Sequence, residues 1–292
     1  MSAAAIVGDT TIPIEYVQDW WDRVLENPEL REQLREQSAF DDLGRVIVTE
    51  AVRHELLREV ARREGISFDE AQVSELIEEL GGEQGAIEAI RPTIYDSTTV
   101  RERARDQLLT VELGRKYYDR TSVTYDFVLV DSRDEAVAKA GELAKDPDKA
   151  RDVIEAAAQE GASTGVGREQ HMADNIDLVL STPLFSVPAG HVVAFAEQGG
   201  GEGAPGQWIV AVITDRSTDA EPDDRDGATS ADDLGDSRLE GVGLRLLALM
   251  GRDVEVRVSP RYGTWSQVFI QSIETEGEIP AVVVPFARPA AS

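Results

Sequence analysis

QWIVAVITDR, at Gln207–Arg216, decides the fold of this chain together with TYDFVLV, at Thr124–Val130. Trp208–Ile213 is an unbroken apolar run, rich in β-branched residues and too short for an ordinary helix, so it predicts a buried strand. TYDFVLV has the same character. About seventy-five residues with helix and loop signals separate the two stretches. We therefore expect a small α+β module whose first and last strands pair, inserted between predominantly helical segments.

Charge and composition exclude several classes of function. The 292 residues include 56 acidic and 29 basic side chains, a formal net charge of −27. Such a protein repels the phosphates of nucleic acid and the headgroups of anionic lipid. No apolar run approaches the ~20 residues that cross a bilayer, and the absence of cysteine excludes disulfides and thiolate chemistry. The length is typical of two domains.

Helical patterns dominate the segment before the module. A short strand at Ala3–Val7 and a turn lead into a helix whose broad apolar face includes Trp20 and Trp21. Core packing is the expectation for both indoles, with a ligand-binding surface as the alternative. Leu43–Arg63 follows as a longer amphipathic helix. His54 lies among charged residues of that helix with no second His or Cys nearby, so no metal site is predicted.

The segment after the module changes character. Residues 217–235 are rich in Asp and Glu and almost free of apolar side chains, which predicts a disordered acidic linker. A short amphipathic helix follows at Leu239–Met250. Asp253–Ser259 alternates strictly between apolar and polar residues, so it predicts a half-buried strand. We expect this strand to pair near Ala3–Val7, which would place the early and late parts of the chain in one domain.

Two aromatic residues, Tyr262 and Trp265, come next. Core packing against the two tryptophans of the first helix is expected, with the lining of a client-binding groove as the alternative. Val268–Ile273 and Ala281–Phe286 are interpreted as one further hairpin.

Two long patterns in the N-terminal segment resemble a known family. They are AAAIVGDTTIPIEYV, at Ala3–Val17, and VTEAVRHELLREVARREGISFDEAQV, at Val48–Val73. These patterns resemble the N-terminal domain of the SurA/PrsA-type extracytoplasmic foldases. That domain has a strand of this form, then an aromatic helix, then a helix that is followed by a short acidic motif. Few helical domains would match both halves in this order.

The middle module resembles the parvulin-type prolyl isomerases at three separate points. DFVLVDSRDEA, at Asp126–Ala136, is similar to the first strand and helix start of that family, and its Ser132–Glu135 is a capping box. LFSVPAGHVV, at Leu184–Val193, is similar to the turn of the family, and GQWIVAVITDR, at Gly206–Arg216, to its last strand. The resemblance therefore covers residues 121–216.

The module also departs from the parvulin pattern. Parvulins place a histidine in each of the two strands, where this chain has Phe127 and Trp208. An aromatic ring cannot supply the polar network of an imidazole. The resemblance then implies a pocket formed by Phe127, Phe185 and Trp208 that binds a client residue without catalysis. No catalytic residue and no cofactor are assigned.

Other parts of the family pattern are missing. Gly161–Asn175 occupies the place of the glycine-rich loop without a recognisable match. His171 and His191 remain in the module, and both are expected in loops as solvated surface residues.

These observations predict an α+β protein with a discontinuous helical chaperone domain, residues 3–120 and 236–280, and a degenerate parvulin-like module at 121–216. The resemblance implies a chaperone for unfolded or nascent secreted polypeptides, held at the outer face of the cell membrane as a lipoprotein. The Ala-rich start has no charged region or long apolar core. The export signal and lipid anchor would therefore have been removed, and a cytoplasmic location is the alternative. Two other functions stay open: an active prolyl isomerase of PrsA type, and a scaffold that binds one fixed partner.

Overall fold

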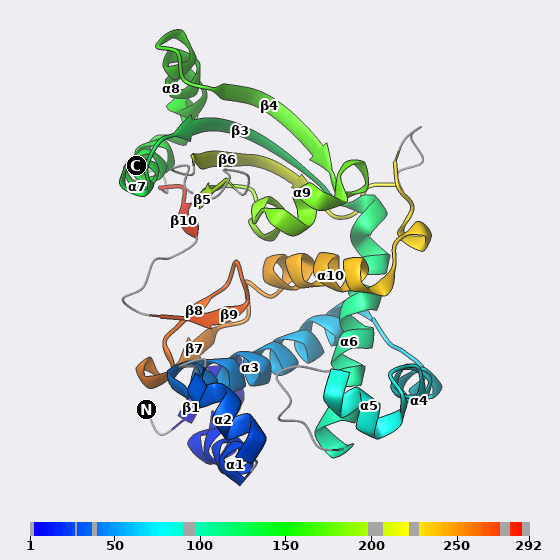
Figure 1. The fold of residues 1–292 in the computed structure, drawn as a ribbon. Helices are drawn as coiled ribbons and strands as arrows, with labels where there is room; N and C mark the ends of the chain where they lie inside the picture. Colours follow the sequence, from blue (N-terminus) through cyan, green and yellow to red (C-terminus); the bar gives the residue numbers. More distant parts are fainter. Residues whose placement is uncertain are drawn as a thin grey trace. The chain divides into compact units, whose positions relative to one another are not determined.

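The fold is α+β, as the sequence predicts (Figure 1). The computed structural model describes residues 3–26, 28–36, 40–89, 97–197, 207–221, 228–274 and 281–287. Two compact units make up the chain: a helical unit, Met1–Leu113 with Met250–Gly277, and a sheet unit, Gly114–Leu249 with Glu278–Ser292. Among the described helices, none combines the length and apolar character that spanning a membrane requires.

The helical unit contains most of the long helices. Its elements are β1 (Ala3–Val7), β2 (Thr10–Pro13), α1 (Ile14–Glu26), α2 (Pro28–Glu36), α3 (Phe40–Glu64), α4 (Glu70–Glu79), α5 (Gly82–Ala89), most of α6 (Ser97–Tyr117), β7 (Val256–Val258), β8 (Thr264–Ser266) and β9 (Gln271–Ile273).

Helix α3 is the central element of the helical unit. Val48, Val52, Leu56 and Val60 recur every four residues along it and are fully buried, which is the pattern of a helix with one core-facing stripe. Helix α4 begins at a capping box in which Asp69 caps the helix and Gln72 hydrogen-bonds back to the Asp69 backbone. The helix therefore begins at the acidic residues Asp69 and Glu70 of the quoted sequence pattern.

The predicted pairing between the early and late strands is confirmed. β7 runs antiparallel to β1, with Ala5 opposite Val258 and Val7 opposite Val256. β2 pairs with the other edge of β1, so the three strands form a sheet in the order β2-β1-β7. The strand is shorter than Asp253–Ser259 because its first residues form a turn.

The sheet unit is built around five antiparallel strands. Its elements are β3 (Ser122–Val130), α7 (Arg133–Lys145), α8 (Pro147–Gln159), β4 (Thr164–His171), α9 (Ile176–Ser181), β5 (His191–Ala196), β6 (Trp208–Ser217), α10 (Asp236–Met250, with Met250 itself in the helical unit), β10 (Ala281–Pro285) and the 3-10 turns Tyr118–Arg120, Met172–Asp174, Leu184–Ser186 and Ala231–Asp233. The strand order is β10-β5-β6-β3-β4.

The two strands that were predicted to pair form the middle of this sheet. β3 and β6 run antiparallel from Val130 opposite Trp208 to Ser122 opposite Ser217. Helices α7 and α8 pack on one face of the sheet, where their buried side chains join those of the strands in one core (Figure 1). His171 ends β4 and His191 begins β5, so the expectation that both lie in loops is wrong.

The last strand corrects the predicted C-terminal hairpin. β10 pairs with β5 in the sheet unit, whereas β9 pairs with β8 in the helical unit (Figure 1). The backbone N–H and C=O groups of the apolar strand β10 form hydrogen bonds with the edge of β5. Val284 and Phe286 then pack against the core under α7, and the Ala287 N–H donates to the Ala144 carbonyl.

Two segments before β7 also differ from the sequence-based expectation. Helix α10 belongs to the sheet unit, whereas the sequence grouped it with the helical domain. Ala231–Asp233 forms a 3-10 turn in which Ala231 is buried, and Leu234 beyond it is buried as well. These two apolar side chains anchor part of the segment that was predicted to be disordered. Residues 222–227 of that segment lie outside the described residues.

Candidate functional site

The structure does not bring the predicted parvulin-like pocket together. Trp208 lies opposite Val130 and packs against the core under α7 and α8. Phe127 is an odd number of positions from Val130 along β3, so its side chain points to the other face of the sheet. The Phe127 ring there covers Gly165 of β4, where an added Cβ would lie 2.5 Å from the ring.

Phe185, the third residue of the predicted pocket, is fully buried in the turn Leu184–Ser186. The guanidinium of Arg216 lies 5.7 Å from the centre of its ring and donates to the Leu184 carbonyl. Burial lowers the pKa of Arg216 to about 9. Phe185 therefore belongs to the interior and presents no ring surface to a client.

The four aromatic residues that the sequence offered as core or groove, Trp20, Trp21, Tyr262 and Trp265, have different surroundings in the helical unit. Tyr262 is buried, and a Cβ added at Gly44 would lie 3.1 Å from the Tyr262 ring and 3.8 Å from the Trp21 indole nitrogen. The indole nitrogen of half-buried Trp265 donates to Gln267. Trp20 instead faces a cavity, so the two adjacent tryptophans have different surroundings.

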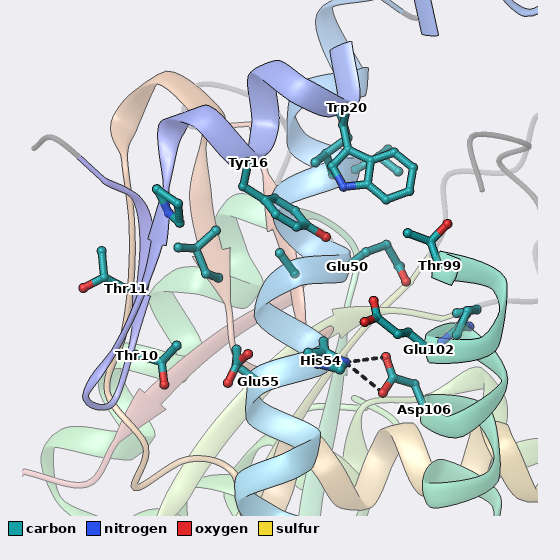
Figure 2. Close-up of a pocket in the computed structure, with 16 residues that line it drawn as sticks. Thr10, Thr11, Tyr16, Trp20, Glu50, His54, Glu55, Thr99, Glu102 and Asp106 are labelled. Carbon is teal, nitrogen blue, oxygen red and sulfur yellow. Dashed lines mark hydrogen bonds and ion pairs between the residues drawn. The ribbon is translucent and has the colours of Figure 1, made fainter. Parts of the chain in front are cut away.

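A cavity of about 320 Å³ lies between β2, α1, α3 and α6 of the helical unit (Figure 2). Its volume is at the lower end of the ~300–1,000 Å³ typical of small-ligand pockets. The lining side chains combine aromatic, aliphatic and acidic groups. They are Thr10, Thr11, Ile12, Pro13, Tyr16, Trp20, Val46, Ile47, Glu50, Ala51, His54, Glu55, Thr99, Glu102, Arg103 and Asp106.

Helical spacing places these side chains. Tyr16 and Trp20 are four residues apart on α1 and meet edge to face, with 6.3 Å between ring centres. Glu50 and His54 are four residues apart on α3, as are Glu102 and Asp106 on α6, so each pair occupies one helix face. Figure 2 shows the α3 and α6 residues directed toward each other below the two rings.

His54 and Asp106 form the best-defined polar contact of the cavity. The His54 Nδ1 atom lies 2.9 Å from both carboxylate oxygens of Asp106 (Figure 2). This hydrogen bond raises the pKa of His54 above its ordinary value, against burial, which acts to lower it. The Coulomb attraction of Asp106 and Glu55 adds to the increase.

Tyr16 experiences the same negative surroundings. Burial raises the pKa of its phenol, and the carboxylates of Glu102 and Glu50 raise it further. Tyr16 as a whole residue is nevertheless 39% exposed. An exposed aromatic ring over a partly apolar cavity with acidic walls is suited to binding a ligand. The ring offers apolar contact, and the carboxylates attract positive charge.

Sequence reasoning missed this cavity. Trp20 was interpreted mainly as core, and His54 was considered only as a metal ligand. The available signal was the four-residue spacing of polar groups on the two helices, but nothing local indicates that α3 and α6 face each other. Within the described ranges, no three His, Cys, Asp or Glu side chains gather so that they could hold a metal ion.

The His54–Asp106 contact predicts a pH-dependent stability. Because the pKa of His54 is raised by folding, its contribution is complete below the unfolded pKa of about 6.5 and is lost as pH rises through the folded pKa. The side chains of His54 and Asp106 are 31% and 14% exposed, so solvent screening limits the contribution to about 1 kcal/mol. Urea unfolding of His54→Gln should therefore show a larger deficit at pH 5.5 than at pH 8.5. An equal deficit at both pH values, or the same pH dependence in an Asp106→Asn background, would contradict this assignment.

Comparisons with known proteins give little beyond this geometry. No protein-family model and no curated protein matches the chain. Among solved structures, the foldase protein PrsA from Lactococcus lactis is 12% identical, with a TM-score of 0.29 over 89% of this chain and 96% of that chain. The foldase protein PrsA from Streptococcus pneumoniae is 13% identical, with a TM-score of 0.20 over 84% and 85% of the two chains. Similarity this weak is not an argument for the function of this chain.

Proposed function

We propose that this protein is an extracytoplasmic chaperone that holds unfolded or nascent secreted polypeptides through its helical unit. The observation that supports this most directly is the cavity beneath Tyr16, which joins exposed aromatic surface to aliphatic and acidic walls. A holding chaperone needs apolar surface that stays accessible and a charged periphery that keeps the protein soluble. The net charge of −27 meets the second requirement.

The proposal includes an extracytoplasmic location. Export, and attachment to a membrane through a removed N-terminal anchor, rest on the sequence resemblance to SurA/PrsA-type foldases. A fractionation experiment on the natural host would test it directly.

Chaperone activity should depend on Tyr16. Replacing Tyr16 by Ala removes an aromatic contact of about 1 kcal/mol, so about fivefold more protein should be needed for half-suppression of aggregation. Light scattering with several unrelated denatured clients would measure this. Leu25→Ala is the matched control, because Leu25 is an exposed apolar residue of the same helix outside the cavity lining. Equal loss in both variants would contradict a role for the cavity, and activity toward only one client would favour the fixed-partner scaffold.

We also propose that the sheet unit does not catalyse prolyl isomerisation. The uncatalysed barrier is ~18–20 kcal/mol, and lowering it requires groups that bind the twisted amide better than the planar one. Phe127 and Trp208 point to opposite faces of the sheet, and Phe185 is buried. NMR exchange on Xaa-Pro peptides should give rates within about twofold of the uncatalysed reaction. Clear acceleration that Phe127→Ala abolishes would instead establish an isomerase.

A further inference from the structure

The cavity of the helical unit has an excess of negative charge. Glu50, Glu55, Glu102 and Asp106 line it, against the cationic Arg103 and the titratable His54. Three of the four carboxylates have nearby ion-pair partners. Arg53 lies 3.0 Å from Glu50, Arg58 lies 3.7 Å from Glu55, and His54 contacts Asp106. Among the described residues, Glu102 has no ion-pair partner.

The titratable groups of the cavity respond to this charge. Burial raises the pKa of Tyr16, and Glu102 and Glu50 raise it further, while Arg23 lowers it. The hydrogen bond to Asp106 raises the pKa of His54, and the charges of Asp106 and Glu55 raise it further, while Arg58 lowers it. The contributions of the carboxylates have the sign of a negative potential, which stabilises a cation and repels an anion.

The aromatic wall is also suited to a cation with an apolar stem. The guanidinium of Arg23, which is not among the residues that line the cavity, lies 5.2 Å from the Trp20 ring centre, the geometry in which an aromatic ring attracts a cation. Val46, Ile47 and Ala51 add aliphatic surface from α3. Arginine and lysine side chains have this combination, a methylene stem that packs on apolar surface and a charged end that seeks carboxylates.

We propose, resting on the proposed chaperone function, that the cavity is a subsite for an arginine or lysine side chain of the bound polypeptide. The stem lies against Tyr16 and Trp20, and the charged end lies near Glu50 and Glu102. The protein then selects unfolded segments in which a basic residue accompanies apolar ones, and it rejects acidic segments.

Capped amino acids test the subsite without requiring a client protein. N-acetyl-arginine amide and N-acetyl-norleucine amide have similar stems but differ in charge. NMR titration of the full chain should show about tenfold tighter binding of the arginine probe, a ratio expected for one charge-assisted interaction. The double variant Glu50→Gln, Glu102→Gln should bring the ratio close to one while norleucine binding is retained.

Glu78→Gln, Glu79→Gln is the matched control. Both residues are exposed on α4 and lie outside the cavity lining, so this variant loses the same charge and should keep the tenfold ratio. A ratio near one in the wild-type protein, or a ratio unchanged in the cavity variant, would overturn the subsite.

The pH dependence gives a second readout. Protonation of His54, which faces Asp106 on α6 and lies beside Glu55 and Arg58 on α3, adds positive charge to the cavity. The preference for arginine should therefore decrease as pH falls, and His54→Gln should remove most of this decrease. An arginine preference that grows at low pH would argue against the subsite.

The outcomes separate the two proposals. Suppression of aggregation without an arginine preference overturns the subsite alone. An arginine preference without any suppression of aggregation overturns the chaperone function and leaves a cation-binding cavity.

Discussion

Ending the chain after Met250 is expected to unfold the helical unit, although the deleted residues lie more than a hundred positions after the first part of that unit, Met1–Leu113. The segment supplies β7 to the sheet of β1 and buries Tyr262, Val268 and Ile270. Each buried side chain contributes about 1.5–3 kcal/mol, so three together approach the ~5–15 kcal/mol that stabilises a whole domain.

Specific hydrogen bonds join the same segment to α3. The Ser272 N–H donates to the Thr49 hydroxyl at 2.9 Å, and the Arg53 Nε–H donates to the Ile270 carbonyl at 2.6 Å. Removing the segment leaves these groups of α3 without partners. Hydrogen exchange of the α3 amides should then become fast.

A chain that ends after Glu274 is the control for this truncation. It keeps β7, β8 and β9 and loses β10, which pairs with β5 in the sheet unit. Protection of α3 should be retained, while the β5 amides that bond β10 should exchange faster. Persistent protection of α3 in the chain ending at Met250 would show that the helical unit folds without its late strands.

Replacing Gly114 by Ala is expected to destabilise the sheet unit by about 3 kcal/mol, the upper part of the range for overpacking. A Cβ at Gly114 of α6 would lie 2.2 Å from the Leu239 carbonyl oxygen and 3.2 Å from the Gly243 nitrogen of α10. Both are backbone atoms, so the helices would have to separate. Leu239, Leu246 and Leu247 of α10, all buried, would lose contacts.

Gly141→Ala is the matched control for this substitution. Gly141 also lies within a helix, α7, but a Cβ there would meet nothing within 4 Å. Alanine should therefore stabilise the protein by about 0.5–1 kcal/mol through helix propensity. Thermal melts of the two variants should shift in opposite directions, and a Gly114→Ala protein as stable as wild type would refute the close packing of α6 and α10.

Local patterns in the sequence predicted much of the fold. The apolar runs of β3 and β6, the Ser132 capping position of α7 and the alternation of β7 all specify structure through neighbouring residues. Strand β4 was missed because TGVGREQH has small and polar residues and lies at a sheet edge with a largely exposed burial pattern. An edge strand of this kind has no hydrophobic signature.

Long-range placement could not be predicted in the same way. The apolar character of β10 indicates burial but not the partner strand, which lies almost ninety residues earlier. The cavity is likewise formed by residues of α1, α3 and α6 that are far apart in the chain. Phe127 and Trp208 stand at the two positions where the family pattern has histidines, but the register that places them on opposite faces depends on strand pairing.

The late position of β7 and β10 affects the order of events during synthesis. Among the described strands, the helical unit lacks β9 until Ile273 has emerged, and the sheet unit lacks β10 until Pro285 has emerged. At ~5–20 residues per second, roughly ten to thirty seconds separate the appearance of Leu113 from that of Gly277. During this interval the edge of β1 that later receives β7 is unpaired, and an unpaired edge can associate with other chains. The nascent chain is therefore itself exposed to misassembly until β7 has emerged and paired with β1.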